Sequence, residues 1–304
     1  MARTQGTLEA LAARQHGLVT LEQAAKLGSD RKVVHRLVRS WRLERVFPGV
    51  YRIVGAPETD RQRLFAALLW GGDDAVASHR TAARLWRLDG EWGDGVEITV
   101  PFGRKNERVP GISVHRTRRL HPRDRRVLSG FPVTGVERTL IDLSRGAEEE
   151  TLEVAMESAV RMGRTSPEAL WRGVDRNPAR RGLRKLRWLL IVRQPEIAYS
   201  RWEVKLLRLI RRAGLPEPVR QFKVWDGTKW RKIDLAYPEL RIALEYDSYT
   251  WHSGRKAWER DHTRNADLIA LGWRVLPITL DDVDLEPART IDRIVRLRRS
   301  ADAA

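Results

Sequence analysis

The sequence contains no cysteine among its 304 residues. This absence excludes disulfides and thiolate metal sites, and the chain has no need of an oxidising compartment. Long apolar runs are missing as well. Residues 1–20 hold none that would serve as a signal sequence, and no stretch approaches the length of a membrane span. From these absences we expect a soluble protein of the cytoplasm.

Positive charge is what the chain has in excess. Its formal net charge at pH 7 is +17, and its isoelectric point is near 10.9. A bias of this size attracts polyanions, and nucleic acid is the usual one, so we expect DNA as a partner. A solvated basic surface is the alternative, and the preference for arginine over lysine can also follow from the base composition of a genome.

Length and apolar content predict a mixed α/β protein of several domains. Hydrophobic residues make up 42% of the chain, which favours packed domains over disorder. A chain of 304 residues also exceeds what one ordinary core needs. We expect three regions, at 1–55, 56–190 and 191–304.

The first region has the pattern of a winged helix-turn-helix. Residues 7–15 predict a short helix, Thr20 and Gln23 form a capping box that opens a second, and a third runs from Ser29 to about Ser40. Alternating apolar residues at 41–53 then predict a two-stranded wing. In such a module the third helix enters the major groove; the alternative is a module that binds another protein or packs on its neighbour. Its candidate DNA contacts are Arg31, Lys32, His35, Arg36 and Arg39.

The middle region carries helical and strand patterns but no spacing typical of catalysis. We expect helices at 60–70, 79–88, 136–144, 149–162 and 167–175, strands at 96–100 and 112–116, and a linker or loop at 175–184. The region has no glycine-rich phosphate loop and no pair of histidines at metal-ligand spacing. His79, His115 and His121 are scattered along it, so we assign them surface or structural roles.

The last region places acidic side chains where they can converge. A helix is predicted at 200–213, and strands at 219–225, 230–237 and 241–247. Alternate residues of a strand share a face, so Glu245 and Asp247 project together. Asp234 can meet them from the adjacent strand and Glu203 from the helix. Converging carboxylates repel each other, and a Mg²⁺ or Mn²⁺ ion held by Asp234, Glu245 and Asp247 would resolve the conflict and activate water beside a phosphate.

Residues beyond the acidic strand complete this candidate nuclease site. His252 follows Asp247 closely and could accept or donate the proton of the reaction. Alone, such a histidine is more often structural than catalytic. A long helix at about 255–271 comes next, and its Arg260 and Arg264 are candidate phosphate contacts. A solvated helix face with internal ion pairs is the alternative.

Five elements of this region, in order and at compatible spacing, resemble the very-short-patch-repair-like, DUF559-type branch of the PD-(D/E)xK nuclease superfamily. They are Ile233-Asp234-Leu235, Leu244-Glu245-Tyr246-Asp247, His252, Arg260-Asp261 with Arg264, and Leu271-Gly272-Trp273-Arg274-Val275. The resemblance covers about residues 198–298 and implies a restriction-endonuclease-like α/β/α core. Asp234, Glu245 and Asp247 match acidic positions of that family's site, Glu203 matches the first-helix glutamate, and His252 matches the histidine that replaces a lysine. The superfamily's usual lysine is Asp247 here.

A second resemblance covers about residues 6–145. The stretch from Gly17 to Tyr51, which ends in Arg45-Val46-Phe47-Pro48-Gly49-Val50-Tyr51, is similar to the winged-helix domain of AbiEi-type antitoxins. Residues 78–83 and 132–143 are similar to the segment that follows this domain. The resemblance implies operator binding, repression of a toxin–antitoxin operon and a cognate toxin as a partner.

Two functions of different classes stay open. The first is a Mg²⁺-dependent DNA endonuclease in defence or repair, targeted by the winged helix, which the converging acids and His252 favour. The second is an antitoxin-like transcriptional repressor with a catalytically inactive nuclease fold, which the missing lysine favours. A protein-interaction scaffold is a third reading, and the charge makes it less attractive. We predict the nuclease, with DNA binding common to the first two readings.

Overall fold

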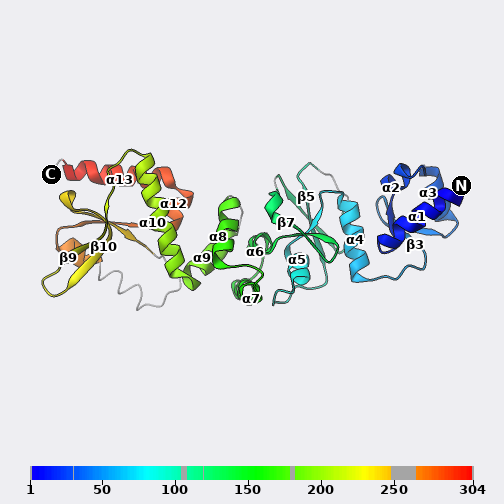
Figure 1. The fold of residues 1–304 in the computed structure, drawn as a ribbon, viewed down its shortest axis with the longest axis horizontal. Coiled ribbons are helices and arrows are strands. Elements are labelled where there is room, and N and C mark those ends of the chain that lie inside the picture. Colours follow the sequence, from blue (N-terminus) through cyan, green and yellow to red (C-terminus); the bar gives the residue numbers. More distant parts are fainter. Residues whose placement is uncertain are drawn as a thin grey trace. The chain divides into compact units, whose positions relative to one another are not determined.

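The structure is a computed structural model that describes residues 2–29, 31–103, 108–118, 120–178, 182–247 and 265–302 (Figure 1). The chain divides into two compact units, Met1–Leu186 and Arg187–Ala304. The first unit contains the winged helix together with nearly all of the middle region, and the predicted boundary between 190 and 191 falls close to the division. Within the described ranges, no helix combines the length and the apolar character that crossing a membrane requires.

The N-terminal part is a winged helix that contains the three predicted helices and the two strands of the predicted wing, together with a short strand between the first two helices that the sequence patterns miss. The helices α1 (Ala2–Arg14), α2 (Leu21–Lys26) and α3 (Arg31–Arg39) surround an antiparallel sheet of β1 (Leu18–Thr20), β3 (Val50–Ile53) and β2 (Leu43–Phe47), in that order. The predicted capping box is present: the Thr20 hydroxyl accepts from Gln23 N, and the Gln23 side chain accepts from Thr20 N. Gly49 turns the wing with a φ of +76°, which glycine adopts without steric cost.

The middle region is a five-stranded sheet with helices packed against it. Its strands β4 (Val76–Ala77), β5 (Val96–Pro101), β6 (Ile112–Thr117), β7 (Arg125–Leu128) and β8 (Phe131–Thr134) are ordered β6-β5-β4-β8-β7. The pairs β5–β6 and β4–β8 are parallel, and the other two pairs are antiparallel. The sequence patterns predict β5 and β6 but miss β4, β7 and β8, which have two to four residues each and so too little alternation to detect.

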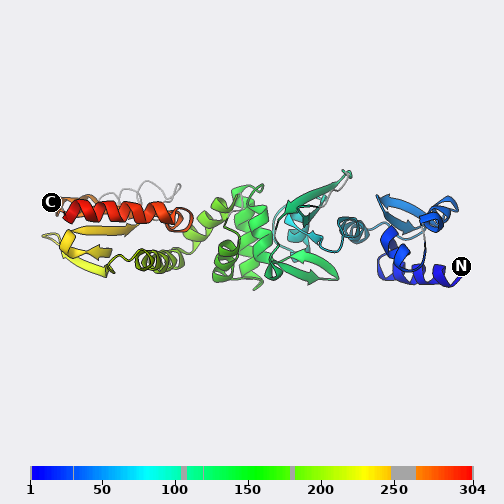
Figure 2. The same ribbon diagram turned by 90° about the horizontal axis from the view of Figure 1, so that it is seen from above.

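The helices of this region match the predicted set. They are α4 (Asp60–Gly71), α5 (His79–Trp86), α6 (Val136–Leu143), α7 (Glu149–Arg161) and α8 (Pro167–Arg176). Figures 1 and 2 show α6, α7 and α8 gathered, in green, beside the sheet. The two ends of the predicted loop at 175–184 are helical, because α8 continues to Arg176 and α9 (Leu183–Arg193) begins at Leu183.

A buried ion pair lies within α6. Arg138 Nε donates to both carboxylate oxygens of Asp142, at 2.9 Å each, one helical turn away. Both side chains are 1% exposed. Asp124, which ends the short 3-10 helix η1 (Pro122–Asp124), is buried nearby and accepts from Arg176 Nη2 at 3.2 Å. Charges are retained this deep when they are paired, so we interpret the group as structural.

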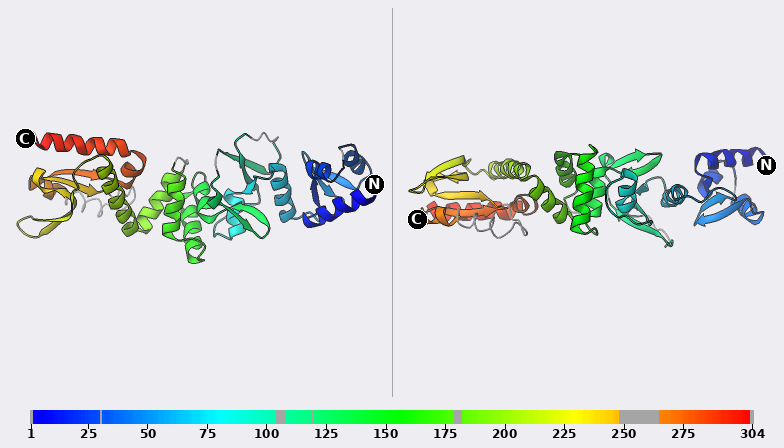
Figure 3. Two further views of the ribbon diagram at one scale, coloured as in Figure 1. Left: turned by 45° about the horizontal axis from the view of Figure 1, so that its top comes forward. Right: turned by 90° about the horizontal axis from the view of Figure 1, so that it is seen from below.

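The second unit is a four-stranded mixed sheet with long helices beside it. Its strands β9 (Val219–Trp225), β10 (Trp230–Tyr237), β11 (Ile242–Tyr246) and β12 (Arg274–Ile278) are ordered β12-β11-β10-β9, and β11–β12 is the parallel pair. A short 3-10 helix, η2 (Pro238–Leu240), joins β10 to β11. The helices are α10 (Pro195–Arg212), α12 (Leu280–Leu285) and α13 (Pro287–Asp302), and Figure 3 shows α13, in red, running alongside the sheet. Of the helix predicted at 255–271, the structure describes the part from residue 265, which is helical to residue 270.

Candidate functional site

The outer face of α3 presents a row of basic side chains. On its inner face Val34 is buried, and Leu37 and Val38 pack against the same small core. Arg31 Nε donates to His35 Nε2 at 3.4 Å, one turn along the helix. All five residues predicted to contact DNA are exposed: Arg31, Lys32, His35, Arg36 and Arg39. The helix therefore exposes its basic side chains while its apolar face packs on the core of the domain.

Two further arginines beside α3 are absent from the sequence prediction. Arg42 and Arg45 are both exposed at the start of the wing. Arg45 lies on β2 at the same parity as the buried Leu43 and Phe47, so regular alternation would turn it inward, and its exposure accompanies a register shift of the strand between Arg45 and Phe47. The sequence offers only the basic character of Arg45 as a signal, because the register shift depends on how β2 pairs with β3.

In the second unit, Asp234 and Glu245 come together on neighbouring strands. They are only 8% and 4% exposed. The backbone pairing of β10 with β11 ends at Leu235, opposite Leu244. At the next residues, side-chain carboxylates accept from the backbone instead: Asp234 N donates to Glu245 Oε1 at 3.2 Å, and Tyr246 N donates to Asp234 Oδ2 at 3.0 Å. Each carboxylate thus accepts a backbone amide at the end of the ladder. These hydrogen bonds help two acids to stay buried side by side.

Tyr199 of α10 adds a third hydrogen bond to this pair. Its hydroxyl donates to Asp234 Oδ1 at 3.3 Å and accepts from Gln221 Nε2. Burial, followed by the negative charges of Asp234, Glu203 and Glu245, raises the pKa of Tyr199 well above its usual range. Tyr199 is therefore a neutral hydrogen-bond donor at physiological pH. Sequence reasoning missed it, because the predicted helix begins at residue 200, whereas α10 begins at Pro195 and so places Tyr199 one turn before Glu203 on the same face.

The remaining predicted members of the acidic site are placed differently. Glu203 lies on α10, with Arg220 Nη1 3.6 Å from its Oε1. Asp247 follows β11, and its backbone N–H donates to the carbonyl of Ile278 at 3.1 Å. Burial and the charge of Asp247 raise the pKa of Tyr246 to about 12. Three predicted residues lie outside the described part of the chain: His252, Arg260 and Arg264.

The donor chemistry of Asp234 and Glu245 fits a hard dication. Mg²⁺ and Mn²⁺ bind through one or two carboxylates together with waters and phosphate oxygens. Among the described residues, however, three side chains with ligand atoms within 4.8 Å of one another occur in the first unit. The described acidic residues of the second unit do not form such a group of three. The three-carboxylate set of Asp234, Glu245 and Asp247 stays a prediction.

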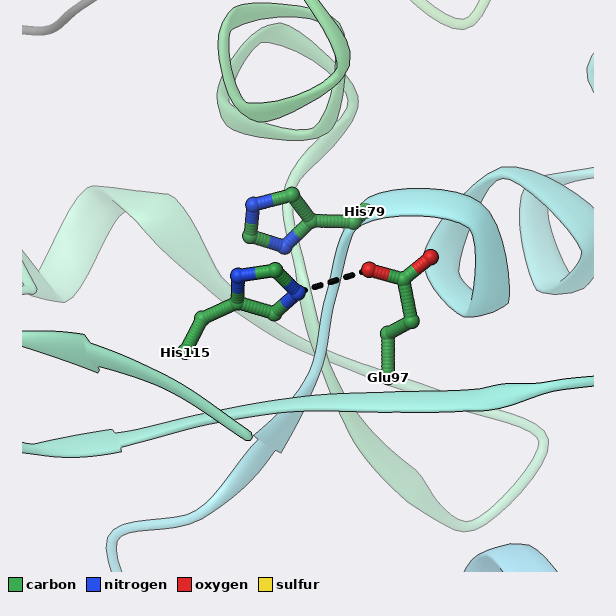
Figure 4. A group of neighbouring side chains, drawn as sticks. All are labelled: His79, Glu97 and His115. Atoms are coloured by element: carbon green, nitrogen blue, oxygen red, sulfur yellow. Dashed lines mark hydrogen bonds and ion pairs between the residues drawn. The ribbon is translucent and has the colours of Figure 1, made fainter. Parts of the chain in front are cut away.

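The group of three consists of His79, Glu97 and His115, two of which the sequence treats as scattered histidines. His115 on β6 lies beside Thr99 of β5 in the parallel register, so Glu97, two residues earlier on β5, shares its face of the sheet. His79 is the first residue of α5. Figure 4 shows its ring stacked on that of His115. The ring centroids are 3.5 Å apart and the ring planes differ by 17°. His115 Nε2 donates to Glu97 Oε2 at 2.6 Å.

Local structure constrains the direction of the His79 ring. Ser78 Oγ lies 2.9 Å from His79 Nδ1 and accepts from the Thr99 hydroxyl at 2.8 Å. The backbone of His79 has a φ of +49°. For a residue other than glycine, this left-handed conformation costs on the order of 1–3 kcal/mol and persists where its surroundings enforce it.

The charge of Glu97 is stabilised within this group. Burial would raise the pKa of Glu97, but the hydrogen bond from His115 and the charges of His79, His115 and Arg80 outweigh it and lower the pKa below its ordinary value of 4.5. Arg80 Nε is 3.9 Å from Glu97 Oε1. Glu97 is therefore an ionised acceptor beside two imidazole rings at neutral pH.

Comparison with known proteins agrees with the winged-helix architecture. Residues 7–54 match the family model of the AbiEi antitoxin transcriptional regulator, so the N-terminal domain is a winged helix of this regulator class. The chain is also 34% identical over 262 residues to two uncharacterized proteins of Mycobacterium tuberculosis, Rv2248 of strain ATCC 25618 / H37Rv and MT2308 of strain CDC 1551 / Oshkosh. These alignments cover 85% of this chain and 93% of each relative, and the chain belongs to the same protein family as these two.

A solved structure is similar over part of the chain. The crystal structure of the RV2827C protein from Mycobacterium tuberculosis matches with a TM-score of 0.42 and 18% sequence identity. The match covers 60% of this chain and 74% of that protein.

Proposed function

We propose that the chain is a DNA-binding transcriptional regulator of the AbiEi antitoxin type, with α3 as its DNA-contacting helix. One observation carries the proposal: within a winged helix that matches this regulator family, α3 packs its apolar face on the core and leaves its basic residues exposed. The net charge of +17 suits a polyanionic partner. Such a regulator acts on cytoplasmic DNA, and its protein partner is a cognate toxin. This proposal replaces the nuclease as the main reading, because the family match concerns the regulator domain.

Salt-dependent DNA binding tests the role of α3. We would measure the affinity of the full chain for the DNA upstream of its own gene, by fluorescence anisotropy at several salt concentrations. Replacing Arg36 and Arg39 by Ala should weaken binding and flatten the slope of log affinity against log salt by about 0.9 for each lost phosphate contact.

A matched control separates α3 from total charge. Arg211 and Arg289 are exposed residues of the second unit, each in a surface ion pair of little energetic weight. The Arg211→Ala/Arg289→Ala variant loses the same charge and should keep the salt slope. Equal slopes for both double variants and the unaltered chain would rule out α3 as the contact surface.

A reporter assay tests regulation rather than mere DNA binding. Placed behind the same upstream DNA, a reporter gene should be repressed by the unaltered chain and released by the Arg36→Ala/Arg39→Ala variant. Repression that survives this double substitution would mean that α3 is not the operator-reading element.

A DNA endonuclease activity of the second unit is the second candidate. The buried pair of Asp234 and Glu245 on adjacent strands favours it, because carboxylates in this arrangement suit a Mg²⁺ or Mn²⁺ ion beside a phosphate. The test is cleavage of plasmid and single-stranded DNA with Mg²⁺, Mn²⁺ or chelator, beside Asp234→Asn. Metal-dependent cutting that this variant lacks would establish the enzyme. DNA binding without cutting in either protein would leave the regulator alone.

A further inference from the structure

We infer that His79, Glu97 and His115 form a binding site for a transition-metal dication, with Zn²⁺ as the best-fitting ion. One potential ligand atom from each lies within 4.8 Å of the others, and all three side chains are partly buried. Two imidazole nitrogens and one carboxylate oxygen are ligands that Zn²⁺ accepts, and a site with three protein ligands keeps its fourth position for water. This inference stands on the middle region alone and does not depend on the proposed function.

The convergence of the three ligands is a property of the fold. His79 comes from the start of α5, Glu97 from β5 and His115 from β6, and the parallel register of the two strands places the latter two on one face. Figure 4 shows the stacked rings on one side of the Glu97 carboxylate. An ion bound here would therefore join a helix to two neighbouring strands.

The surroundings of His79 are those of a metal-binding histidine. Histidine ligands are oriented by a hydrogen bond from the ring nitrogen that does not carry the metal. Ser78 Oγ, itself held by the Thr99 hydroxyl, lies beside His79 Nδ1 and can supply this contact. The left-handed backbone at His79 further restricts the directions that the ring can take.

Metal binding requires a small rearrangement. The two rings are nearly parallel, whereas nitrogen lone pairs lie in the ring planes and have to converge on a shared ion. One ring must therefore turn about its Cβ–Cγ bond. The hydrogen bond between His115 Nε2 and Glu97 Oε2 is replaced by a bond from each residue to the ion, with the proton of His115 carried on Nδ1 instead.

Metal titration of the full chain tests the site. After chelator treatment and removal of the chelator, we would titrate the protein with Zn²⁺ by calorimetry and expect one strong site per chain, which excess Mg²⁺ does not displace. Loss of a residue that only hydrogen-bonds to a metal ligand costs about 10–100-fold in metal affinity, so removing a ligand by Glu97→Gln or His115→Gln should weaken Zn²⁺ binding by about 100-fold or more. Lack of a strong site in the unaltered chain would overturn the inference.

Two control variants locate the ion. His121, in the same unit, accepts from Arg123 N and is no member of the group, so His121→Gln should keep Zn²⁺ binding. Asp234→Asn should keep it as well. Binding that survives both ligand substitutions, or that disappears with Asp234→Asn, would place the ion elsewhere and refute the site.

A measurement without substitutions guards against unfolded variants. Co²⁺ bound to the unaltered chain should show the visible absorption of a four- or five-coordinate site with nitrogen ligands, and Zn²⁺ should abolish it. A spectrum that stays that of hydrated, six-coordinate Co²⁺ would contradict the inference regardless of how the variants fold.

Discussion

The middle region and the C-terminal unit both hold carboxylates on sheet strands, partly buried in the first and buried in the second, but they balance the charge in different ways. In the C-terminal unit, Asp234 and Glu245 bring two like charges to facing strands, and backbone amides and the Tyr199 hydroxyl compensate them. In the middle region, one carboxylate, Glu97, faces two imidazoles. The acidic pair thus consists of oxygen donors alone, which hard cations prefer, while the histidine group combines nitrogen and oxygen donors, which transition metals accept.

The comparison indicates that the role of an acidic side chain depends on the groups that surround it. Each of the two groups can have a purely structural role, as the buried ion pair of Arg138 and Asp142 has. Substitutions that remove one partner at a time separate structural from chemical roles, because a structural acid costs stability when lost and a chemical one costs binding or activity.

Asp142→Ala sets the structural benchmark and should have the largest effect. The substitution leaves Arg138 buried at 1% exposure without the carboxylate that accepts from its Nε. Losing one member of a buried pair costs about 3–5 kcal/mol, so the free energy of unfolding in urea should fall by this amount. A change near zero would show that Asp124, whose Oδ2 is 3.9 Å from Arg138 Nη1, is sufficient to balance the charge of the arginine.

Asp234→Ala should cost less, about 1–3 kcal/mol, because Tyr246 N and the Tyr199 hydroxyl lose their acceptor. Asp234→Asn keeps an acceptor oxygen and should recover part of the loss. Thermal melting in chelator compares the three proteins. A higher melting temperature for Asp234→Ala would instead show that repulsion between Asp234 and Glu245 outweighs the hydrogen bonds, as expected of a site awaiting a metal.

Tyr246→Phe should stabilise the protein by up to about 1 kcal/mol at pH 7, because a buried hydroxyl without a partner is costly. The described residues provide no hydrogen-bond partner for this hydroxyl. Its pKa is raised from 10 to about 12, so the folded state holds the proton more tightly, and the unaltered chain should lose stability as the pH rises from 10 through 12. Urea unfolding at neutral and alkaline pH measures both effects. The advantage of the variant should widen at high pH, and an unchanged difference would mean that the hydroxyl is solvated.

Glu97→Gln should have the smallest effect on stability, and this effect should be present only at a pH where Glu97 is ionised. The pKa of Glu97 is lowered in the folded protein, so its contribution is present above pH 4.5 and is lost as the pH falls through the folded value. Melting temperatures of the metal-free proteins should differ at pH 7 and converge as the pH falls from 4.5 through the lowered pKa of Glu97 in the folded protein. Curves that stay parallel over this range would show that Glu97 gains no stability from His115 and Arg80.

Much of the fold follows from local patterns. The capping box of Thr20 and Gln23, the amphipathic α3 and the proline-led α8 all depend on residues within one or two turns of each other, and all are present. The proximity of Asp234 and Glu245 was also predictable from the sequence, because a short connection joins their strands. Tyr199 was not, because its approach to Asp234 depends on how α10 packs on the sheet.

The sequence alone thus determined the winged helix, the outward basic face of α3 and the acidic positions of β10 and β11, since helical and strand periodicities act over a few residues. Only the tertiary structure decided that His79 and His115 stack and that Glu97 joins them. That decision rests on a parallel pairing of β5 with β6 and on the placement of α5. Such pairings are set by the packing of the whole sheet, which no short stretch of sequence encodes.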